Sequence, residues 1–403
     1  MKRRNILPNS FPVFALLLAA CVTAFAQTDP LHVASPDGQL VMRLFIMTPQ
    51  DSRLVRLAYQ VSYRGKLLID TSLLGIAIHD QEPFLGENVG LVTSKAESVD
   101  EIYRLPLGKR QGIRNHYNSL IAQYIQNGSL GRRVTIEARA YDDGVAFRYY
   151  IPRTSTVEDL QIEEELTDFR FAQDGQGFPL ILQNYQSASE GDSRPAKLST
   201  LKRTSLIGLP FLVEQPGVGW VAITEAQLDN YPGMSVFHPE GTTMRTTLAP
   251  RLDDAAIAMH GMTPAETPWR VLMVASEARK LLDSEILKNL NPASPMADTS
   301  WIKPPQQQAK ELFSIDYSPQ FERQMEQRFS DFEKRGEAGV KIDLLNRSDQ
   351  QMIEFYRRAA KSAAGHHLMV EFENAPAPDG IERTWPNVLP REDPAFTKLV
   401  GRF

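Results

Sequence analysis

The chain has 403 residues, of which 42% are hydrophobic and 23% are charged, and its formal net charge at pH 7 is −5. These values are ordinary for a globular protein, so they exclude general disorder and allow substantial hydrophobic cores. The longest basic cluster is Lys2-Arg3-Arg4, and without a basic stripe no nucleic-acid partner is expected.

The first 26 residues have the pattern of a secretory signal peptide. Lys2-Arg3-Arg4 precedes an apolar run over residues 14–20, and Ala24-Phe25-Ala26 fits a small-x-small cleavage site. We therefore expect residues 1–26 to be removed and the protein to be periplasmic or secreted. Leu18-Ala19-Ala20-Cys21 also fits a bacterial lipoprotein box, which leaves lipidation of Cys21 as the alternative.

Cysteine usage and hydropathy exclude several kinds of site. Cys21 is the only cysteine, so disulfides, thiolate catalysis and cysteine-ligated zinc are excluded in the mature chain. After the signal peptide, no apolar run reaches the ~18 residues that a membrane-spanning helix requires, and no transmembrane segment is expected.

From His32 to about Glu285 the sequence pattern is that of β-structure. Leu57, Tyr59, Val61 and Tyr63 fall at every second position, as in a half-buried antiparallel strand. Residues 134–139 and 145–150 flank a turn in which Asp143-Gly144 offers the positive φ of a tight hairpin. Many short strands with turn signals between them predict a large antiparallel sandwich.

The composition changes near Ser294. A segment rich in proline and glutamine follows, in which Pro304-Pro305-Gln306-Gln307-Gln308 stands out, and residues 321–335 then have the spacing of a charged amphipathic helix. We place a domain boundary here, with a β domain at 28–295 and a linker and helix at 296–338.

Residues 339–403 begin with a strand–helix–strand pattern. The strands are predicted at 339–344 and 367–372, and the helix between them has Ser348 and Gln351 as a capping box and Gly365 as its end. Asp343 lies among the last residues of the first strand, and Glu373 follows the second. This is the pattern of one βαβ unit of a parallel sheet or barrel whose functional groups lie at the carboxyl ends of the strands.

Several linked motifs carry a specific resemblance to a known family. In the β-rich part they are Ser35-Pro36-Asp37-Gly38, Ser72-Leu73-Leu74-Gly75, residues 139–149, residues 225–234, Pro268-Trp269-Arg270 and Ser300-Trp301-Ile302-Lys303-Pro304. In the second part they are Val340-Lys341-Ile342-Asp343, Arg347-Ser348-Asp349-Gln350 and residues 383–389. With these motifs the chain resembles glycoside hydrolase family 97, which comprises bacterial exo-acting α-glycosidases.

The resemblance implies a fold and a set of site residues. The fold is an N-terminal β-supersandwich followed by an α/β segment, with residues 339–403 forming part of a (β/α)8 catalytic barrel. Asp343 falls on the nucleophile position of retaining members, and Glu225 and Glu392 fall on calcium-ligand positions. Arg383 and Trp385 are expected to contact the substrate, an oligosaccharide or other α-glycoside of the α-glucosidase or α-galactosidase type.

Departures from the family pattern concern the catalytic chemistry. The acid glutamate expected six residues after Glu392 is Lys398, and Asn374 stands where inverting members have a base glutamate. About 100 residues separate Trp301 from Phe403, whereas a full barrel takes ~250. We therefore expect a shortened chain that is inactive or weakly active, with calcium binding weak or lost. A non-catalytic carbohydrate-binding remnant and a fragment without function are the alternatives.

Overall fold

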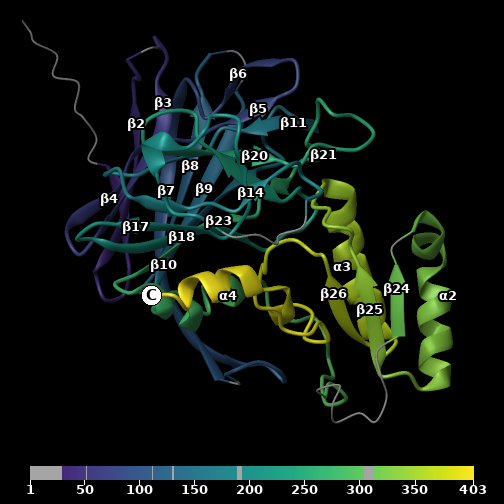
Figure 1. The fold of residues 1–403 in the computed structure, drawn as a ribbon. Helices are drawn as coiled ribbons and strands as arrows, with labels where there is room; N and C mark the ends of the chain where they lie inside the picture. The colour runs from purple at the N-terminus through teal and green to yellow at the C-terminus, as the bar shows by residue number, and fades with distance from the viewer. Residues whose placement is uncertain are drawn as a thin grey trace, which may run out of the picture. The chain divides into compact units, whose positions relative to one another are not determined.

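The structure is a computed structural model that describes residues 30–50, 52–110, 112–128, 131–187, 193–303, 313–316 and 318–403. The predicted signal peptide at 1–26 lies outside these residues. Leu31–Phe403 forms one compact unit. It begins with antiparallel β-structure, which we call the β part, and continues into a parallel sheet with helices, which we call the α/β part (Figure 1).

The described residues of the β part form antiparallel sheets. The largest has the strand order β15-β13-β17-β18-β23-β10-β9-β8-β7, with β22 on β10, and the others have the orders β1-β2-β3-β4, β21-β11-β5-β6 and β12-β20-β19-β16-β14. The strands are β1 Leu31–Ala34, β2 Leu40–Met47, β3 Arg56–Tyr63, β4 Lys66–Leu73, β5 Ile76–Ile78, β6 Gln81–Leu85, β7 Val89–Arg104, β8 Gly112–Gln126, β9 Arg133–Tyr141, β10 Gly144–Ile151, β11 Asp159–Glu165, β12 Asp168–Arg170, β13 Gln176–Phe178, β14 Ile181–Leu182, β15 Ala196–Lys197, β16 Leu206–Ile207, β17 Phe211–Gln215, β18 Gly219–Ala226, β19 Met234–Phe237, β20 Thr243–Leu248, β21 Met259–Met262, β22 Ala265–Glu266 and β23 Trp269–Ala275. The prediction of a large antiparallel β-structure is confirmed.

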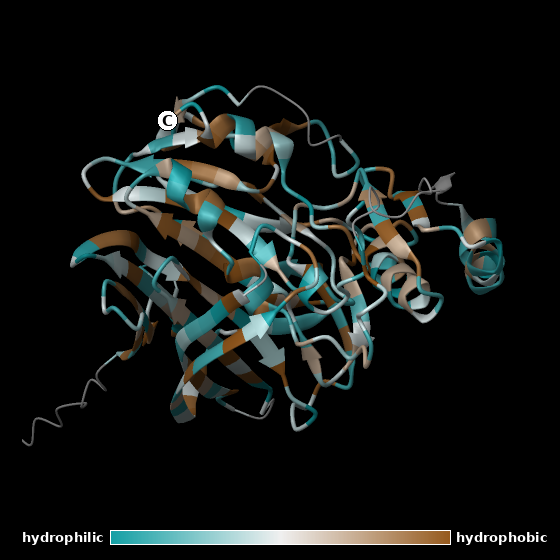
Figure 2. Ribbon diagram, turned by 90° about the horizontal axis from the view of Figure 1, so that it is seen from below, coloured by the Kyte–Doolittle hydropathy of each residue, from teal (hydrophilic) through white to brown (hydrophobic). Residues whose placement is uncertain are grey.

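Strand β23, near the middle of the largest sheet, is buried on both faces. Along β23, Leu272 and Val274 lie in the core between the sheets, whereas Trp269, Val271 and Met273 belong to a second hydrophobic cluster on the opposite face. This division follows from the two-residue period of a strand. The short helices η2 (Ala278–Asp283) and α1 (Ile286–Leu290) contribute apolar residues to that second cluster, which we call the outer cluster. In Figure 2, hydrophobic and hydrophilic bands alternate along many of the strands.

The predicted hairpin at residues 134–150 is present as β9 and β10, with Tyr141 paired to Gly144 across the turn. The reason for the glycine differs from the one expected. Gly144 does not adopt a positive φ; instead, a Cβ at this position would lie 2.7 Å from the carbonyl oxygen of Leu272 and 2.8 Å from Ile286 Cδ1. The glycine therefore allows β23 and α1 to approach the hairpin closely.

The α/β part contains a parallel sheet of the order β24-β25-β26, formed by Phe313–Asp316, Gly339–Asp343 and Met369–Glu373. Helices α2 (Pro319–Arg335) and α3 (Gln350–Gly365) pack with Val340, Ile342 and Val370 into one hydrophobic cluster. The sheet begins earlier than predicted, because β24 falls in the stretch expected to be linker and helix. The helix cap also differs from the prediction, since Asp349, not Ser348, accepts the hydrogen bond from the Met352 N–H.

The described residues show three parallel strands and one further parallel bridge, between Val370 and Val388. These described residues do not form a closed barrel, and the partial barrel stays a prediction. After β26 the chain forms η4 (Ile381–Arg383) and α4 (Pro394–Val400), and α4 returns to the β part, where Phe396, Leu399 and Val400 join the outer cluster. In the described part of the chain, no helix combines the length and the apolar character needed to cross a bilayer.

Candidate active site

Asp343 ends strand β25, and its carboxylate is held by uncharged donors. Its Oδ1 accepts hydrogen bonds from Asn374 Nδ2 at 2.9 Å and from the Leu345 N–H at 2.8 Å. Asp343 pairs in register with Glu373, the last residue of β26. The carboxylate thus lies at the carboxyl end of a parallel sheet, where functional groups of such sheets are commonly found.

The backbone around Asp343 is unusual in three places. Leu345, Asn346 and Asn374 have φ values of 56°, 56° and 48°, in the left-handed region that residues with a Cβ rarely adopt. The two loops are tied together, because the Asn346 N–H donates to the Asn374 carbonyl at 2.9 Å. Such conformations cost ~1–3 kcal/mol each and concentrate at functional sites. The strained loops fix the direction of the Asp343 carboxylate.

Glu373 is the carboxylate opposite Asp343, and it forms an ion pair with Lys341. Lys341 Nζ lies 2.6 Å from Glu373 Oε1 and 3.3 Å from Glu371 Oε1. These side chains share one face of the sheet with Asp343, because all of them occupy every second position of paired strands. The face that would line a barrel is therefore a charged, half-exposed surface, and Glu373 is an ion-pair partner on it.

Glu225 lies near the end of β18 and is buried. Its carboxylate accepts from Arg270 Nη1 at 2.7 Å and from the Met234 N–H at 3.0 Å. The same guanidinium is bonded to Glu165 at 2.6 and 2.8 Å. Burial raises the pKa of Glu225 to about 7, although Arg270 and the Met234 N–H oppose the rise. One arginine, Arg270, therefore forms ion pairs with two buried carboxylates, Glu165 and Glu225.

A cavity of about 50 Å³ lies beside Glu225 and is lined also by Tyr185, Asn346 and Ser348. It is the place where the β part meets the loop that follows Asp343. A volume of this size holds a water molecule or a small ion but is well below the ~150 Å³ that accommodates a six-membered ring. Among the described residues, the cavity between Glu225 and Asn346 is therefore smaller than a sugar ring requires.

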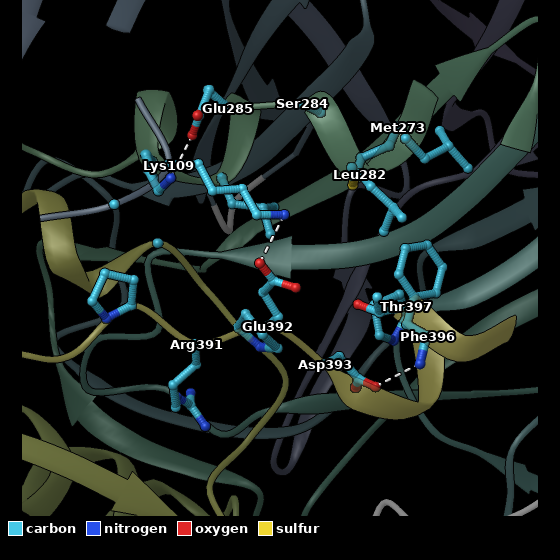
Figure 3. A pocket seen from close by; sticks show the side chains of 18 of the residues that line it. Lys109, Met273, Leu282, Ser284, Glu285, Arg391, Glu392, Asp393, Phe396 and Thr397 are labelled. Atoms are coloured by element: carbon cyan, nitrogen blue, oxygen red, sulfur yellow. Dashed lines mark hydrogen bonds and ion pairs between the residues drawn. The ribbon is translucent and has the colours of Figure 1, made fainter. Parts of the chain in front are cut away.

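Glu392 lies in a different cavity, of about 170 Å³, between the β part and the segment leading to α4 (Figure 3). Its carboxylate is half-exposed and lies 2.8 Å from Lys109 Nζ. The structure thus does not bring Glu225 and Glu392 into one cavity. Within the described ranges, no group of three or more acidic, histidine or cysteine side chains could hold a metal ion.

The two residues expected to contact substrate have structural partners. Arg383 is buried, its Nη1 donates to the Asn289 carbonyl at 2.8 Å, and its guanidinium lies 4.1 Å from the centroid of the Tyr103 ring. Trp385 is half-buried and packs against the hydrophobic cluster of the α/β part. Their role toward a sugar stays a prediction.

Lys398, at the expected acid position, lies on α4 and is exposed to solvent. Helix α4 packs through its other side onto the outer cluster of the β part. The structure therefore places the side chain at this position on the solvent-exposed side of a helix that packs onto the β part.

Sequence reasoning missed Asp379, which joins the two parts of the structure. Its Oδ2 accepts from the Leu228 N–H at 3.0 Å and from Arg357 Nη2 at 2.7 Å, while its Oδ1 accepts from the Tyr356 hydroxyl at 3.2 Å. Its carbonyl accepts from Asn291 Nδ2 at 2.6 Å. In the sequence, Pro378-Asp379-Gly380 is only a turn signal, so the partners could not be foreseen.

Comparison with known families gives two matches. A family described as "Glycosyl-hydrolase 97 N-terminal" matches residues 33–292, and one described as "Glycoside hydrolase 97" matches residues 306–393. Together they cover both the β part and the α/β part.

Two curated relatives and a solved structure agree with these matches. The chain is 25% identical over 478 residues to a retaining α-galactosidase of Bacteroides thetaiotaomicron, covering 93% of this chain and 69% of the relative. It is 24% identical over 451 residues to a probable retaining α-galactosidase of Streptomyces bingchenggensis, covering 94% and 68%. A family 97 enzyme from Pseudoalteromonas sp. strain K8, solved in complex with acarbose, has a TM-score of 0.78 at 18% identity and covers 89% and 68% of the two chains.

The first of these alignments extends over more positions than this chain has residues, 478 against 403. The Bacteroides enzyme therefore carries segments, within the matched stretch, that have no counterpart here.

Proposed function

Because the chain belongs to glycoside hydrolase family 97, we propose that it is an α-glycoside hydrolase of the α-galactosidase type whose turnover is slow. Asp343 is the nucleophile in this proposal. Two observations carry it: Asp343 is held in place by hydrogen bonds, and a lysine, Lys398, stands on α4 at the position expected to supply the acid.

Two carboxyl groups are needed for hydrolysis with retention, one to attack the anomeric carbon and one to protonate the departing oxygen, and they lie ~5 Å apart. Here the hydrogen-bonding partners of Asp343 are an amide side chain and a backbone N–H. Glu373, on the neighbouring strand, is bound to the Lys341 ammonium. A lysine ammonium is a poor proton donor at neutral pH. Loss of general acid catalysis costs roughly 10²–10⁴-fold in rate.

Leaving-group chemistry tests this proposal. An aryl α-galactoside with a strongly acidic phenol needs little protonation, so we expect slow release of the phenol from that substrate and very little cleavage of an unactivated α-galactosyl disaccharide. Asp343→Asn should abolish the phenol release. Glu371→Gln is the matched control, because Glu371 is a carboxylate of the same sheet face that also contacts Lys341. Rapid turnover of the disaccharide that depends on Asp343 would overturn the proposal.

The family resemblance also implies calcium, and the side chains present do not fit it. Calcium takes six to eight oxygen ligands, with affinity rising with the number of carboxylates. Glu225 is bonded to Arg270, Glu392 is paired with Lys109, and the two line different cavities. We therefore assign no catalytic step to calcium. Calorimetry is expected to detect no micromolar calcium binding; such binding, lost in Glu225→Ala, would contradict this assignment.

The second candidate function is carbohydrate binding without catalysis. It is favoured by the extensive hydrophobic core of the β part, together with a lysine, Lys398, at the position expected to supply the acid. Unchanged affinity for a galactoside in Asp343→Asn, with no hydrolysis by either protein, would support it over slow catalysis. The pattern of residues 1–26 supports export for either function.

A further inference from the structure

The cavity that contains Glu392 is amphipathic. Met273, Leu282 and Phe396 gather at one end, and Lys109, Glu285 and Arg391 gather at the other (Figure 3). Its walls come from the β7–β8 loop, from η2 and α1, and from the segment between Pro378 and Thr397. Its volume of about 170 Å³ exceeds the ~150 Å³ in which a six-membered ring is known to bind. The cavity can therefore hold one ring with an apolar side and a polar side.

The charges that line this cavity are close to balanced. Three cations face four carboxyls: Lys109, Lys288 and Arg391 on one hand, and Glu285, Glu382, Glu392 and Asp393 on the other. A highly charged ligand would gain little binding energy from a lining in which positive and negative charges nearly cancel. A neutral ligand with many hydroxyl groups would find both donors and acceptors.

Glu382 is a largely buried carboxyl in the lining of this cavity. Its side chain is 12% exposed, and its ion pair with Lys288 is long, at 4.0 Å. The same ammonium lies 2.5 Å from Glu285. Burial also raises the pKa of Glu382. A carboxylate has acceptor sites for several hydrogen bonds, so this buried carboxyl can accept from a ligand hydroxyl as well.

We propose that this cavity binds one neutral pyranose unit, with the apolar side of the ring against Phe396 and the hydroxyl groups toward Glu382 and Glu392. Aromatic side chains offer the large flat apolar surface that such a ring face requires. The choice of a pyranose follows from the proposed function. The site itself is distinct from the Asp343 site, since Asp343 does not line this cavity.

The test is the binding of methyl α-galactoside to the purified full-length protein, measured by calorimetry or by ligand-observed NMR. Cyclohexanol serves as a ring without the pattern of hydroxyls. We expect the galactoside to bind, and Glu382→Met, Glu392→Ala and Phe396→Ala each to weaken it roughly five- to tenfold, the effect of losing about one hydrogen bond or apolar contact. Asp343→Asn should leave binding to this cavity unchanged.

Three outcomes would overturn the proposal: no binding of the galactoside, equally strong binding of cyclohexanol, or binding that is lost in Asp343→Asn and unaffected by the cavity variants. The last outcome would place the sugar at the Asp343 site and leave the proposed function standing. Glu392 is half-exposed, so Glu392→Ala keeps the test decisive where a melting curve shows that Glu382→Met or Phe396→Ala does not fold.

Discussion

Replacement of Asp379 by alanine should destabilise the protein more than any exposed ion-pair change. Asp379 is 1% exposed and receives hydrogen bonds from the backbone of the β part and from two side chains of α3. Its removal leaves the Arg357 guanidinium, which is 11% exposed, without its carboxylate. It also leaves the Leu228 N–H without an acceptor.

The magnitude follows from these contacts. Removing one member of a buried ion pair costs ~3–5 kcal/mol. With an unfolding entropy of ~2.1 cal/mol/K per residue over ~370 residues, this corresponds to a melting temperature lower by roughly 4–6 °C. Asp379→Asn keeps the shape and part of the hydrogen bonding, so it should fall between alanine and the wild type. Melting followed by circular dichroism measures both.

Asp253→Ala is the matched control. Asp253 also pairs with an arginine, Arg251 at 2.7 Å, but its side chain is 55% exposed. Solvent screens such pairs, so this variant should melt at nearly the wild-type temperature. If Asp379→Ala melted within 1 °C of the wild type, the view that Asp379 joins the two parts would be wrong.

Three further outcomes are expected. The folded-state pKa of Glu225 is raised to about 7, so between about pH 4.5 and 7 the folded protein holds a proton on Glu225 that the unfolded protein releases. The free energy of unfolding should therefore fall as pH rises through this range. Glu225→Gln should flatten this decline, measured by urea titration at several pH values, and an unchanged pH dependence would refute the prediction. Gly380→Ala should lower the free energy of unfolding by well over the ~1 kcal/mol expected for Gly241→Ala. Both glycines have positive φ, but only at Gly380 would an added Cβ lie 2.3 Å from the carbonyl oxygen of Leu287. Removal of calcium with a chelator should leave the melting temperature unchanged, whereas a fall of several degrees would reveal a bound ion.

The β part could be predicted well because its signals are local. The alternation along residues 57–63 and the turn at 142–143 depend only on neighbours in the sequence, and both strands and hairpin are present. The same locality explains the wrong helix cap, since Ser348 and Asp349 are adjacent and both are good capping residues. β24 was missed because four residues beside a Pro- and Gln-rich segment give little periodicity.

The candidate site was less predictable because its contacts join distant parts of the chain. Asp343 could be proposed as a site residue from its place at the end of a strand and from the family resemblance. Two contacts depend on how β18, β23 and the final segment pack. Glu225 is bonded to Arg270, 45 residues away, and Glu392 is paired with Lys109 and does not lie beside Glu225. No local pattern encodes such pairs, and they decide whether these carboxylates are available to a metal ion.

Strand β7 lies at the end of the strand order of the largest sheet, and most of its 16 residues are exposed. Such an edge offers unpaired backbone groups to any other extended polypeptide, which makes it a site for aggregation. Lys95, Glu97 and Asp100 interrupt it with charge, although Leu91 and Val92 remain exposed. Solubility of this protein therefore depends partly on a few surface charges along one edge strand, and their loss should first cause precipitation at high concentration.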